Sequence, residues 1–240
     1  MNLWDFDAQV IMKSGETTTT EQVLRLATTE RPYAVAAMNG HVMFAAKDYN
    51  NRDVLVFSKL VLSIDDVQEC YQEADPTASE INDVVATDGG VIPLSHIPEI
   101  VHMEEGMGGI VIFTKDGIWM LTGDSTYGFS ATSTRLTKVS TIGCIATISV
   151  VKLDDTFYFW NKDGIWIMAK NEYGDIKVQN ISRKVIGKFI QQFSLKNIER
   201  VCGDVDVLAG KVYYTIPNFA NSVQGTFRYR STILTYTNTS

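Results

Sequence analysis

Short runs of β-branched and aromatic residues recur along the chain, separated by polar turns. Such runs are typical of β-strands, and Asn-Gly between two of them is a strong hairpin signal. From residue 32 onward the pattern predicts a strand, a turn at Asn39-Gly40, a second strand, a polar loop and a third strand. These three strands are expected over Ala34–Met38, Val42–Ala46 and Val54–Ser58.

The pentapeptide Lys-Asp-Gly-Ile-Trp occurs twice, beginning at Lys115 and at Lys162, 47 residues apart. Each copy lies between two apolar runs, which are Ile110–Phe113 and Ile118–Leu121 for the first and Thr156–Trp160 and Ile165–Met168 for the second. Asp-Gly suits a type I′ turn, in which both central residues need a positive φ. We therefore expect two type I′ hairpins, with each Trp packing against its neighbours on the outgoing strand.

The hairpins form a repeat. A more diverged copy is expected over Gly210–Ile216 and Thr232–Tyr236, and intervening strands are expected over Arg135–Ser140, Cys144–Leu153, Ile176–Ile181 and Val201–Leu208. A period of about 40–50 residues with about four strands per repeat is typical of β-propeller blades. The sequence therefore predicts a predominantly all-β fold of propeller-like blades of antiparallel strands, with two short helices inserted.

Both predicted helices begin with capping signals. The first has Asp75 at the N-cap and Pro76 at the first helical position, and the second follows Ser182. Their apolar positions have helical spacing and are expected to pack against the sheets; they are Ala78, Ile81, Val84 and Val85 in the first helix and Val185, Ile186, Phe189, Ile190 and Phe193 in the second.

The domain organisation follows from these elements. We expect an N-terminal arm, or a strand of a neighbouring blade, over residues 1–31, and a propeller-type domain over 32–240 with a helical insertion at 61–107. Because propellers close with about four to eight blades, we expect the chain to be part of a longer protein.

Composition describes an ordinary folded chain, with 45% hydrophobic and 20% charged residues. The N-terminus lacks the pattern of a signal peptide, and no apolar stretch is long enough to span a bilayer. Cys70, Cys144 and Cys202 are far apart and form no CxxC motif. This argues against a disulfide scaffold or a zinc site and favours buried or half-buried free thiols in a reducing compartment.

The formal net charge of −7 argues against specific binding to nucleic acid phosphates. The densest basic stretches are Arg183-Lys184 with Lys188, and Phe227–Arg230. In the second stretch aromatic residues alternate with arginines, as in a single-strand binder, but an ordinary strand with its arginines in water has the same pattern. We expect the ordinary strand.

Catalytic motifs are absent from the sequence. It has no GxGxxG, GxxxxGK[ST] or GxSxG pattern, and Gly106–Gly109 precedes a strand rather than a helix. His41, His96 and His102 lack metal-ligand spacing. The only concentration of carboxylates, Asp65–Asp75, is expected to be a solvated loop. We therefore predict no catalytic residue, no cofactor-binding residue and no metal ligand.

One segment, Phe57–Ile92, carries a resemblance to a known family. Together with Arg31–Ala36 before it and Val111–Trp119 and Thr137–Cys144 after it, it resembles the tail nozzle family (tail tubular protein B) of short-tailed bacteriophages. The family pattern has an "RP-x-A-V-A" hairpin, an "F/W-S-K" step, a helix with "ATDGG" and a "VFT-x-x-G-x-W-x-L" hairpin. The resemblance covers roughly residues 31–182, and family members are several times longer.

The resemblance implies a structural virion protein without enzymatic activity or cofactors. Family subunits form a homohexameric ring that continues the DNA channel below the portal and connector, and that takes part in genome retention and ejection. The implied partners are other copies of the chain, the connector or adaptor protein, tail fibre or needle proteins, and genomic DNA passing through the lumen. The implied location is the phage tail, assembled in the host cytoplasm. An acidic surface would let DNA slide past by repelling its phosphates.

Two other functions are consistent with a propeller. A carbohydrate-active or glycan-binding propeller of a phage tail would use a carboxylate pair such as Asp65 and Asp66, with Trp119, Trp160 or Trp166 stacking on sugars. A cytoplasmic WD-repeat scaffold would show a Gly-His and a Trp-Asp pattern in each repeat, which this chain lacks.

Overall fold

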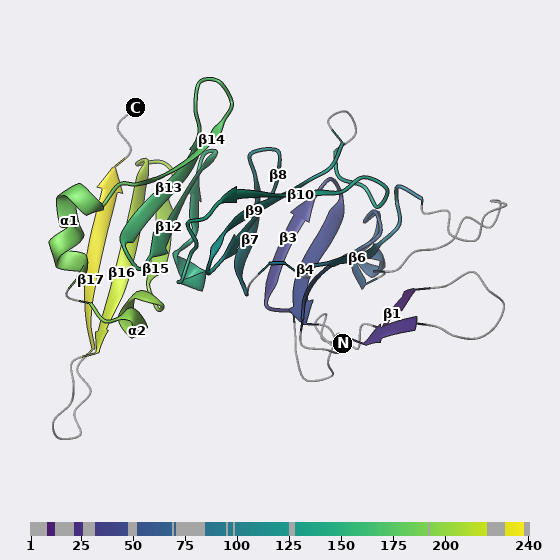
Figure 1. The fold of residues 1–240 in the computed structure, drawn as a ribbon, viewed down its shortest axis with the longest axis horizontal. Coiled ribbons are helices and arrows are strands. Elements are labelled where there is room, and N and C mark those ends of the chain that lie inside the picture. The colour runs from purple at the N-terminus through teal and green to yellow at the C-terminus, as the bar shows by residue number, and fades with distance from the viewer. Residues whose placement is uncertain are drawn as a thin grey trace, which may run out of the picture. The chain divides into compact units, whose positions relative to one another are not determined.

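Antiparallel β-strands make up most of the chain (Figure 1). The structure is a computed structural model that describes residues 9–12, 22–25, 32–47, 52–68, 70, 85–94, 96–97, 99–124, 128–191, 193–219 and 229–237. The predicted all-β class is confirmed. Within the described ranges the sheets remain separate, and neither a closed barrel nor a closed propeller is seen.

Four sheets follow one another along the chain, and in each of them every strand pairs with the next. The first contains β3 (Ala34–Met38), β4 (His41–Lys47), β5 (Asp53–Phe57) and β6 (Gly90–Pro93). The second contains β7 (Ile100–Gly106), β8 (Gly109–Thr114), β9 (Gly117–Thr122) and β10 (Arg135–Ser140). The third contains β11 (Val151–Leu153), β12 (Thr156–Asn161), β13 (Gly164–Lys170) and β14 (Ile176–Asn180). The fourth contains β15 (Cys202–Asp206), β16 (Lys211–Phe219) and β17 (Tyr229–Thr237).

A separate hairpin joins β1 (Gln9–Met12) to β2 (Gln22–Arg25). The described helices are short: two 3₁₀ turns, η1 (Ile64–Gln68) and η2 (Thr147–Ser149), and two α-helices, α1 (Arg183–Ile190) and α2 (Leu195–Ile198). The predicted second helix is thus confirmed as α1.

The chain divides into two compact units. Unit 1 comprises residues 1–112 and 119–137, and unit 2 comprises residues 113–118 and 138–240. In unit 1 the first strands of two sheets, β3 and β7, lie beside each other. The unit 1 core contains fully buried side chains from several strands: Met43, Leu55, Ile110, Ile112 and Leu121.

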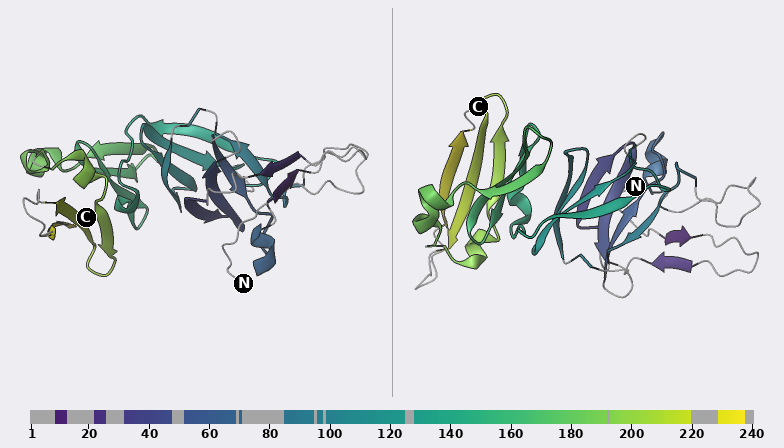
Figure 2. Two further views of the ribbon diagram at one scale, coloured as in Figure 1. Left: turned by 90° about the horizontal axis from the view of Figure 1, so that it is seen from below. Right: turned by 45° about the horizontal axis from the view of Figure 1, so that its top comes forward.

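Unit 2 has its own core. One face of β12 and β13 packs toward β16, and the fully buried Trp160 and Tyr214 rings meet edge to face with centroids 5.7 Å apart. The first strands β11 and β15 lie beside each other, as β3 and β7 do in unit 1. On the opposite face of β12, Phe157 and Phe159 contact Phe113, with centroid distances of 5.7 and 5.3 Å. Figure 2 shows the strands of β11–β14 and β15–β17 as two layers.

The structure corrects several predicted elements. The expected helical insertion at 61–107 also contains two strands, β6 and β7. The sequence of β7 alternates apolar with polar residues from Val101 to Glu104, and its burial alternates in the same way, so the period-two signal was present. The strand expected over Cys144–Leu153 is reduced to η2 and the three residues of β11. The helix expected from Asp75 lies outside the described residues, apart from Val85.

The turn type predicted for the repeated pentapeptide is wrong. Neither Asp116 nor Asp163 has a positive φ, and Asn161 pairs with Gly164, so the second turn is Lys162-Asp163. Gly164, just after that turn, has the positive φ of 116°. Two-residue turns with both φ positive occur instead at Asn39-Gly40, with 51° and 78°, and at Met107-Gly108, with 57° and 85°.

The register of the repeat changes accordingly. Asn39-Gly40 and Met107-Gly108 each join the first and second strands of a sheet, whereas the Lys-Asp-Gly turns join the second and third. The equivalent position in the first sheet is the loop after Lys47. The sequence pattern suggested that Asn39-Gly40 is a copy of the Lys-Asp-Gly turn. It is not, because the two turns join different pairs of strands.

Candidate functional site

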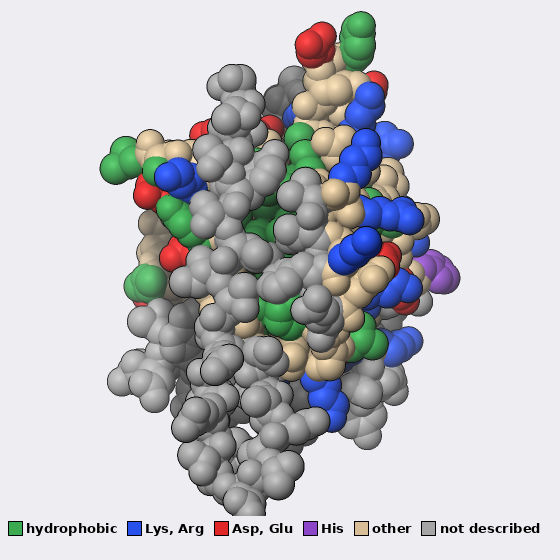
Figure 3. All heavy atoms as spheres, turned by 90° about the vertical axis from the view of Figure 1, so that its left-hand side faces the viewer, with side chains coloured by type: hydrophobic (Ala, Val, Ile, Leu, Met, Phe, Trp, Pro, Cys, Tyr) green, Lys and Arg blue, Asp and Glu red, His purple; other side chains and the backbone are tan. Residues whose placement is uncertain are grey.

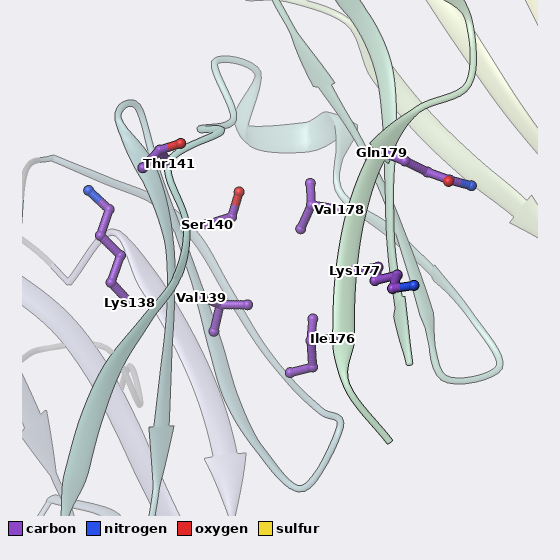
Figure 4. Close-up of a pocket in the computed structure, with 8 residues that line it drawn as sticks. All are labelled: Lys138, Val139, Ser140, Thr141, Ile176, Lys177, Val178 and Gln179. Atoms are coloured by element: carbon purple, nitrogen blue, oxygen red, sulfur yellow. The ribbon is translucent and has the colours of Figure 1, made fainter. Parts of the chain in front are cut away.

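Unit 2 has a groove of about 670 Å³ between the end of β10 and β14. Both strands lie at the edge of their sheets. The lining consists of two consecutive stretches, residues 138–141 and 176–179. Figure 4 shows Val139, Ile176 and Val178 pointing into the space between the strands, while Lys138 and Lys177 point away from it.

The chemistry of this groove favours contact rather than catalysis. Its lining contains no carboxylate, histidine or cysteine, so it offers neither a general acid-base pair nor a nucleophile with a base. The hydroxyl of Ser140 already accepts a hydrogen bond from the Ile142 N–H at 3.0 Å. Apolar walls beside two sheet edges are suited to packing against an extended segment.

Unit 1 has a second concavity, of about 690 Å³, beside the turn at Asn39. Its only charged lining residues are Asp124 and Arg135. The backbones of Asp124 and Gly128 bond to each other in both directions at 2.9 Å, which fixes this rim. A single carboxylate does not provide the pair that glycoside hydrolysis needs.

The acidic segment considered for catalysis is structural at Asp66. Its Oδ2 atom accepts hydrogen bonds from the N–H groups of Leu62 (2.8 Å) and Ser63 (2.6 Å), and its other carboxylate oxygen lies 3.3 Å from the Lys59 ammonium. These backbone hydrogen bonds lower the pKa of Asp66, and Lys59 lowers it further. Asp65 is exposed. Both residues therefore lie in the first turn of η1, where the Asp66 carboxylate accepts backbone N–H groups and the Asp65 side chain is exposed to solvent.

The tryptophans considered as sugar platforms lie within the packed sheets. Trp160 is fully buried in the unit 2 core, and Trp119 packs against the unit 1 core. Trp166 is half-buried, and its indole nitrogen is shielded from solvent. None of the three is among the exposed side chains, whereas a sugar-stacking platform needs an open ring face.

The histidines do not come together. His41 is buried, with its Nδ1 2.7 Å from the Ser58 carbonyl oxygen and its ring edge to face with Phe57 and Phe129. His96 is exposed, and His102 lies 3.4 Å from Glu104. Across the described residues no three His, Cys, Asp or Glu side chains are grouped closely enough to hold a metal ion.

All three cysteines are free thiols, as expected, but only two are buried. Burial raises the pKa of Cys70 to about 12 and that of Cys144 to about 11, so both remain protonated at neutral pH. Cys202 is exposed, contrary to expectation, because it begins the edge strand β15.

The structure describes the side chains of only one of the two basic stretches. Arg183, Lys184 and Lys188 are exposed on α1. Of the stretch Phe227–Arg230, only the backbone of Tyr229 and Arg230 falls within the described residues, at the start of β17. Gly106–Gly109 holds the hairpin turn between β7 and β8 and forms no phosphate-binding loop.

Sequence reasoning missed a pair of serine hydroxyls that each bond to a backbone N–H of a neighbouring strand. Ser58 Oγ accepts from the Val42 N–H at 2.9 Å, and Ser182 Oγ accepts from the Ile165 N–H at 2.9 Å. Both serines are buried and directly or closely follow a strand. Asn180, rather than Ser182, accepts the Arg183 N–H at the start of α1, at 2.7 Å. The sequence signal that could have predicted these hydrogen bonds is a serine that lies just after the end of a predicted strand.

No protein-family model matches the chain, and no curated protein matches it. In the described part of the chain, no helix has both the length and the apolarity required to cross a membrane.

Proposed function

We propose that this chain is a structural subunit of the tail nozzle ring of a short-tailed bacteriophage, and that its sheets are successive blades of a propeller. The proposal rests on the sequence resemblance around residues 31–182 and on the sheet order. A run of meander sheets is the architecture that propeller blades require. The single observation that carries the proposal is the adjacency of first strands, β3 with β7 and β11 with β15.

The adjacency of first strands has a geometric meaning. In a propeller the first strand of each blade lies near the central axis, and neighbouring blades diverge toward their fourth strands. The groove between β10 and β14, two fourth strands, is consistent with that divergence. Further blades, from a longer chain or from other subunits, would complete the ring of sheets.

The proposed role is mechanical. The subunit would join copies of itself, as a homohexamer, beneath the connector or adaptor protein and near the tail fibre or needle proteins. Genomic DNA would pass through the lumen without specific contacts, and the protein would act in the virion after assembly in the host cytoplasm. Two observations support a structural function over a catalytic one. The groove between β10 and β14 is lined without carboxylate, histidine or cysteine, and Asp66 accepts backbone hydrogen bonds.

Electron microscopy of the purified full chain, supported by its mass in solution, tests this proposal. Closed rings with a central channel, or incorporation into phage tails in place of the resident subunit, are the expected results. A chain that remains monomeric at high concentration and is excluded from tail particles would contradict the proposal.

The glycan-active alternative has no specific observation in its favour. It predicts release of reducing sugar from host polysaccharide, lost in both Asp65→Asn and Asp66→Asn. We expect no release from the unmodified chain, since neither of the two concavities described above is lined by a tryptophan or by a pair of carboxylates.

A further inference from the structure

The outer edge of β14 is the free edge of its sheet. Two hydrogen bonds at the ends of the β13–β14 ladder show which backbone groups of β14 point outward. The Asn171 N–H donates to the Asp175 carbonyl at 2.9 Å, and the Ile181 N–H donates to the Ile165 carbonyl at 3.0 Å. Between these ends the residues of β14 alternate, and every second one points its backbone groups away from β13.

Both ends of the ladder give the same assignment. The backbone groups of Lys177 and Gln179 point toward β13, whereas those of Ile176 and Val178 point out of the sheet. Among the described residues, nothing bonds to the outward N–H and carbonyl groups of Ile176 and Val178. These groups are therefore arranged to pair with one further strand.

The two faces of β14 differ at this edge. Ile176 and Val178 point into the groove, as does Val139 of β10 (Figure 4). Val178 pairs with Met168, which is fully buried, so the groove is the open continuation of a packed apolar face. Lys177 lies on the opposite face, because successive residues of a strand alternate.

The face that carries Lys177 is rich in cations. This face packs toward the unit 2 core, and Ile190 joins α1 to the same core. Arg183, Lys184 and Lys188 of α1 are exposed, and Figure 3 shows Lys and Arg side chains gathered along one side of the face that carries α1. No described carboxylate lies within ion-pair distance of these four cations.

Unit 2 is basic as a whole. It has 14 Lys and Arg against 9 Asp and Glu, a formal net charge of +5. Unit 1 has 7 Lys and Arg against 19 Asp and Glu, a formal net charge of −12, and the two together give the −7 of the chain. The groove lining contains Lys138 and Lys177 and no carboxylate. The charge around the groove therefore favours an acidic occupant.

The same charge disfavours a second copy of β14 as the occupant. If Ile176 paired with Val178 of another copy, the two Lys177 side chains would lie opposite each other. Like charges in that position are destabilising, and edge lysines are a common protection against such self-pairing. The occupant is thus expected to differ from β14 in sequence and in charge.

We propose that the groove between β10 and β14 binds an extended acidic segment of another protein, which adds a strand to the β14 edge. Alternate residues of the segment are apolar and face Val139, Ile176 and Val178, and a carboxylate between them lies opposite Lys177. In an antiparallel addition Lys177 is in a non-hydrogen-bonded pair, where side chains of the two strands are closest. The inference does not depend on the nozzle proposal, because the site consists of unit 2 residues alone.

Two synthetic peptides test the inference. The probe is Gly-Ser-Val-Glu-Val-Glu-Val-Gly-Ser, and the control has Lys in place of both Glu. Each is titrated into the full chain labelled with ¹⁵N, and binding is followed by the backbone amide signals. We expect the acidic peptide to bind about fivefold or more tightly than the control. It should shift the outward N–H signals of Ile176 and Val178 more than the inward ones of Lys177 and Gln179.

Three variants of the full chain test the contacts. Val178→Pro removes an outward N–H without breaking a bond to β13, and it should weaken binding by about tenfold. Lys177→Glu should weaken the acidic peptide by about fivefold and strengthen the lysine peptide. Lys196→Glu, the same charge change on the exposed surface of α2, should leave both affinities unchanged. Thermal unfolding of each variant checks that the fold is retained.

Several results would overturn the inference. One is that neither peptide binds the wild type at about 1 mM, and another is that both bind it equally. A third is that Lys196→Glu weakens the acidic peptide as much as Lys177→Glu does. If self-association of the chain displaces the peptide, the occupant is a second copy and the inference is also wrong.

Discussion

At the scale of single residues, buried polar groups in this protein act by satisfying backbone groups of neighbouring strands. The Ser182 hydroxyl accepts the Ile165 N–H at the start of β13, and it also lies 3.3 Å from Asn180 Oδ1. Since water cannot reach the buried Ile165 N–H, this hydroxyl is its hydrogen-bond partner. Asp66 has a comparable role at the surface, where its charge adds to the hydrogen bonds.

We predict that Ser182→Ala lowers the free energy of unfolding by about 1–3 kcal/mol, because the buried N–H of Ile165 loses its acceptor. Chemical denaturation followed by circular dichroism measures the change. Ser63→Ala removes an exposed hydroxyl and is expected to change stability by less than about 0.5 kcal/mol. Equal effects of the two substitutions would contradict the assigned role.

Asp66 makes a pH-dependent contribution. Because its pKa is lowered in the folded protein, its carboxylate stabilises the fold above its ordinary pKa of 3.8, and this stabilisation is lost as the pH falls through the folded value. Asp66→Asn should therefore be less stable than the wild type at neutral pH, and the difference should disappear in acid. Unfolding measured from about pH 7 down to about pH 2 checks this. Asp65→Asn, which changes an exposed neighbour, is the control and should alter stability at neutral pH by less than about 0.5 kcal/mol.

At the scale of the elements, close backbone contacts determine where glycine is needed. The turn of the first Lys-Asp-Gly copy lies against the backbone of Gly143, where an added Cβ would overlap the carbonyl oxygen of Lys115. Cys144 N–H donates to the Thr114 carbonyl at 2.9 Å, and the Asn161 side-chain amide donates to the Gly143 carbonyl. The hairpin turn is thus held by residues 143–144, which follow it in the chain after two further strands, β9 and β10.

We predict that Gly143→Ala destabilises the protein by about 3 kcal/mol, since the clash is with backbone that cannot move aside cheaply. Gly187 is the matched comparison, because it lies within α1 with open space around its Cα. Gly187→Ala is expected to stabilise by about 0.5–1 kcal/mol through better helix propensity. Thermal and denaturant unfolding of both variants measures the two signs, and destabilisation by Gly187→Ala would contradict the open environment.

At the scale of the whole molecule, the boundary between the units does not follow the sheets. Unit 2 includes residues 113–118, the middle of the β8–β9 hairpin, although the rest of that hairpin belongs to unit 1. These residues pack with unit 2 because the Phe113 ring contacts Phe157 and Phe159, which are fully buried. Unit 2 therefore depends on a segment that is separated from it in sequence.

A pair of fragments tests this dependence. We predict that residues 107–240, which keep Phe113, retain a cooperative thermal transition. Residues 119–240 should instead bind a hydrophobic dye and unfold without cooperativity, because Phe157 and Phe159 lose their cover. Circular dichroism and dye fluorescence give the measurement. A shorter fragment as stable as the longer one would show that Phe113 is dispensable.

Much of the strand pattern was predictable from local sequence. Ala34–Met38 and Arg135–Ser140 were predicted with the bounds of β3 and β10, because their residues and flanking turns favour strands without outside help. The absence of catalytic, cofactor-binding and metal-ligating residues was also expected from the sequence and stays a prediction. The turn type of Lys-Asp-Gly could not be predicted from the Asp-Gly dipeptide alone. Gly164 has a φ of 116°, and a Cβ at this position would overlap the side chains of Ser182 and Ile190, which are distant in the sequence.

The sequence by itself determined the all-β class, the repeated hairpins and the helix at residues 183–190, because strand, turn and capping preferences act between near neighbours. Only the tertiary structure decided which strands are first in each sheet, where the serine hydroxyls bond, and how charge divides between the units. Each of these depends on contacts between residues far apart in the chain. The net charge of −7 is a property of the sequence, whereas its separation into −12 and +5 exists only once the chain has folded into two units.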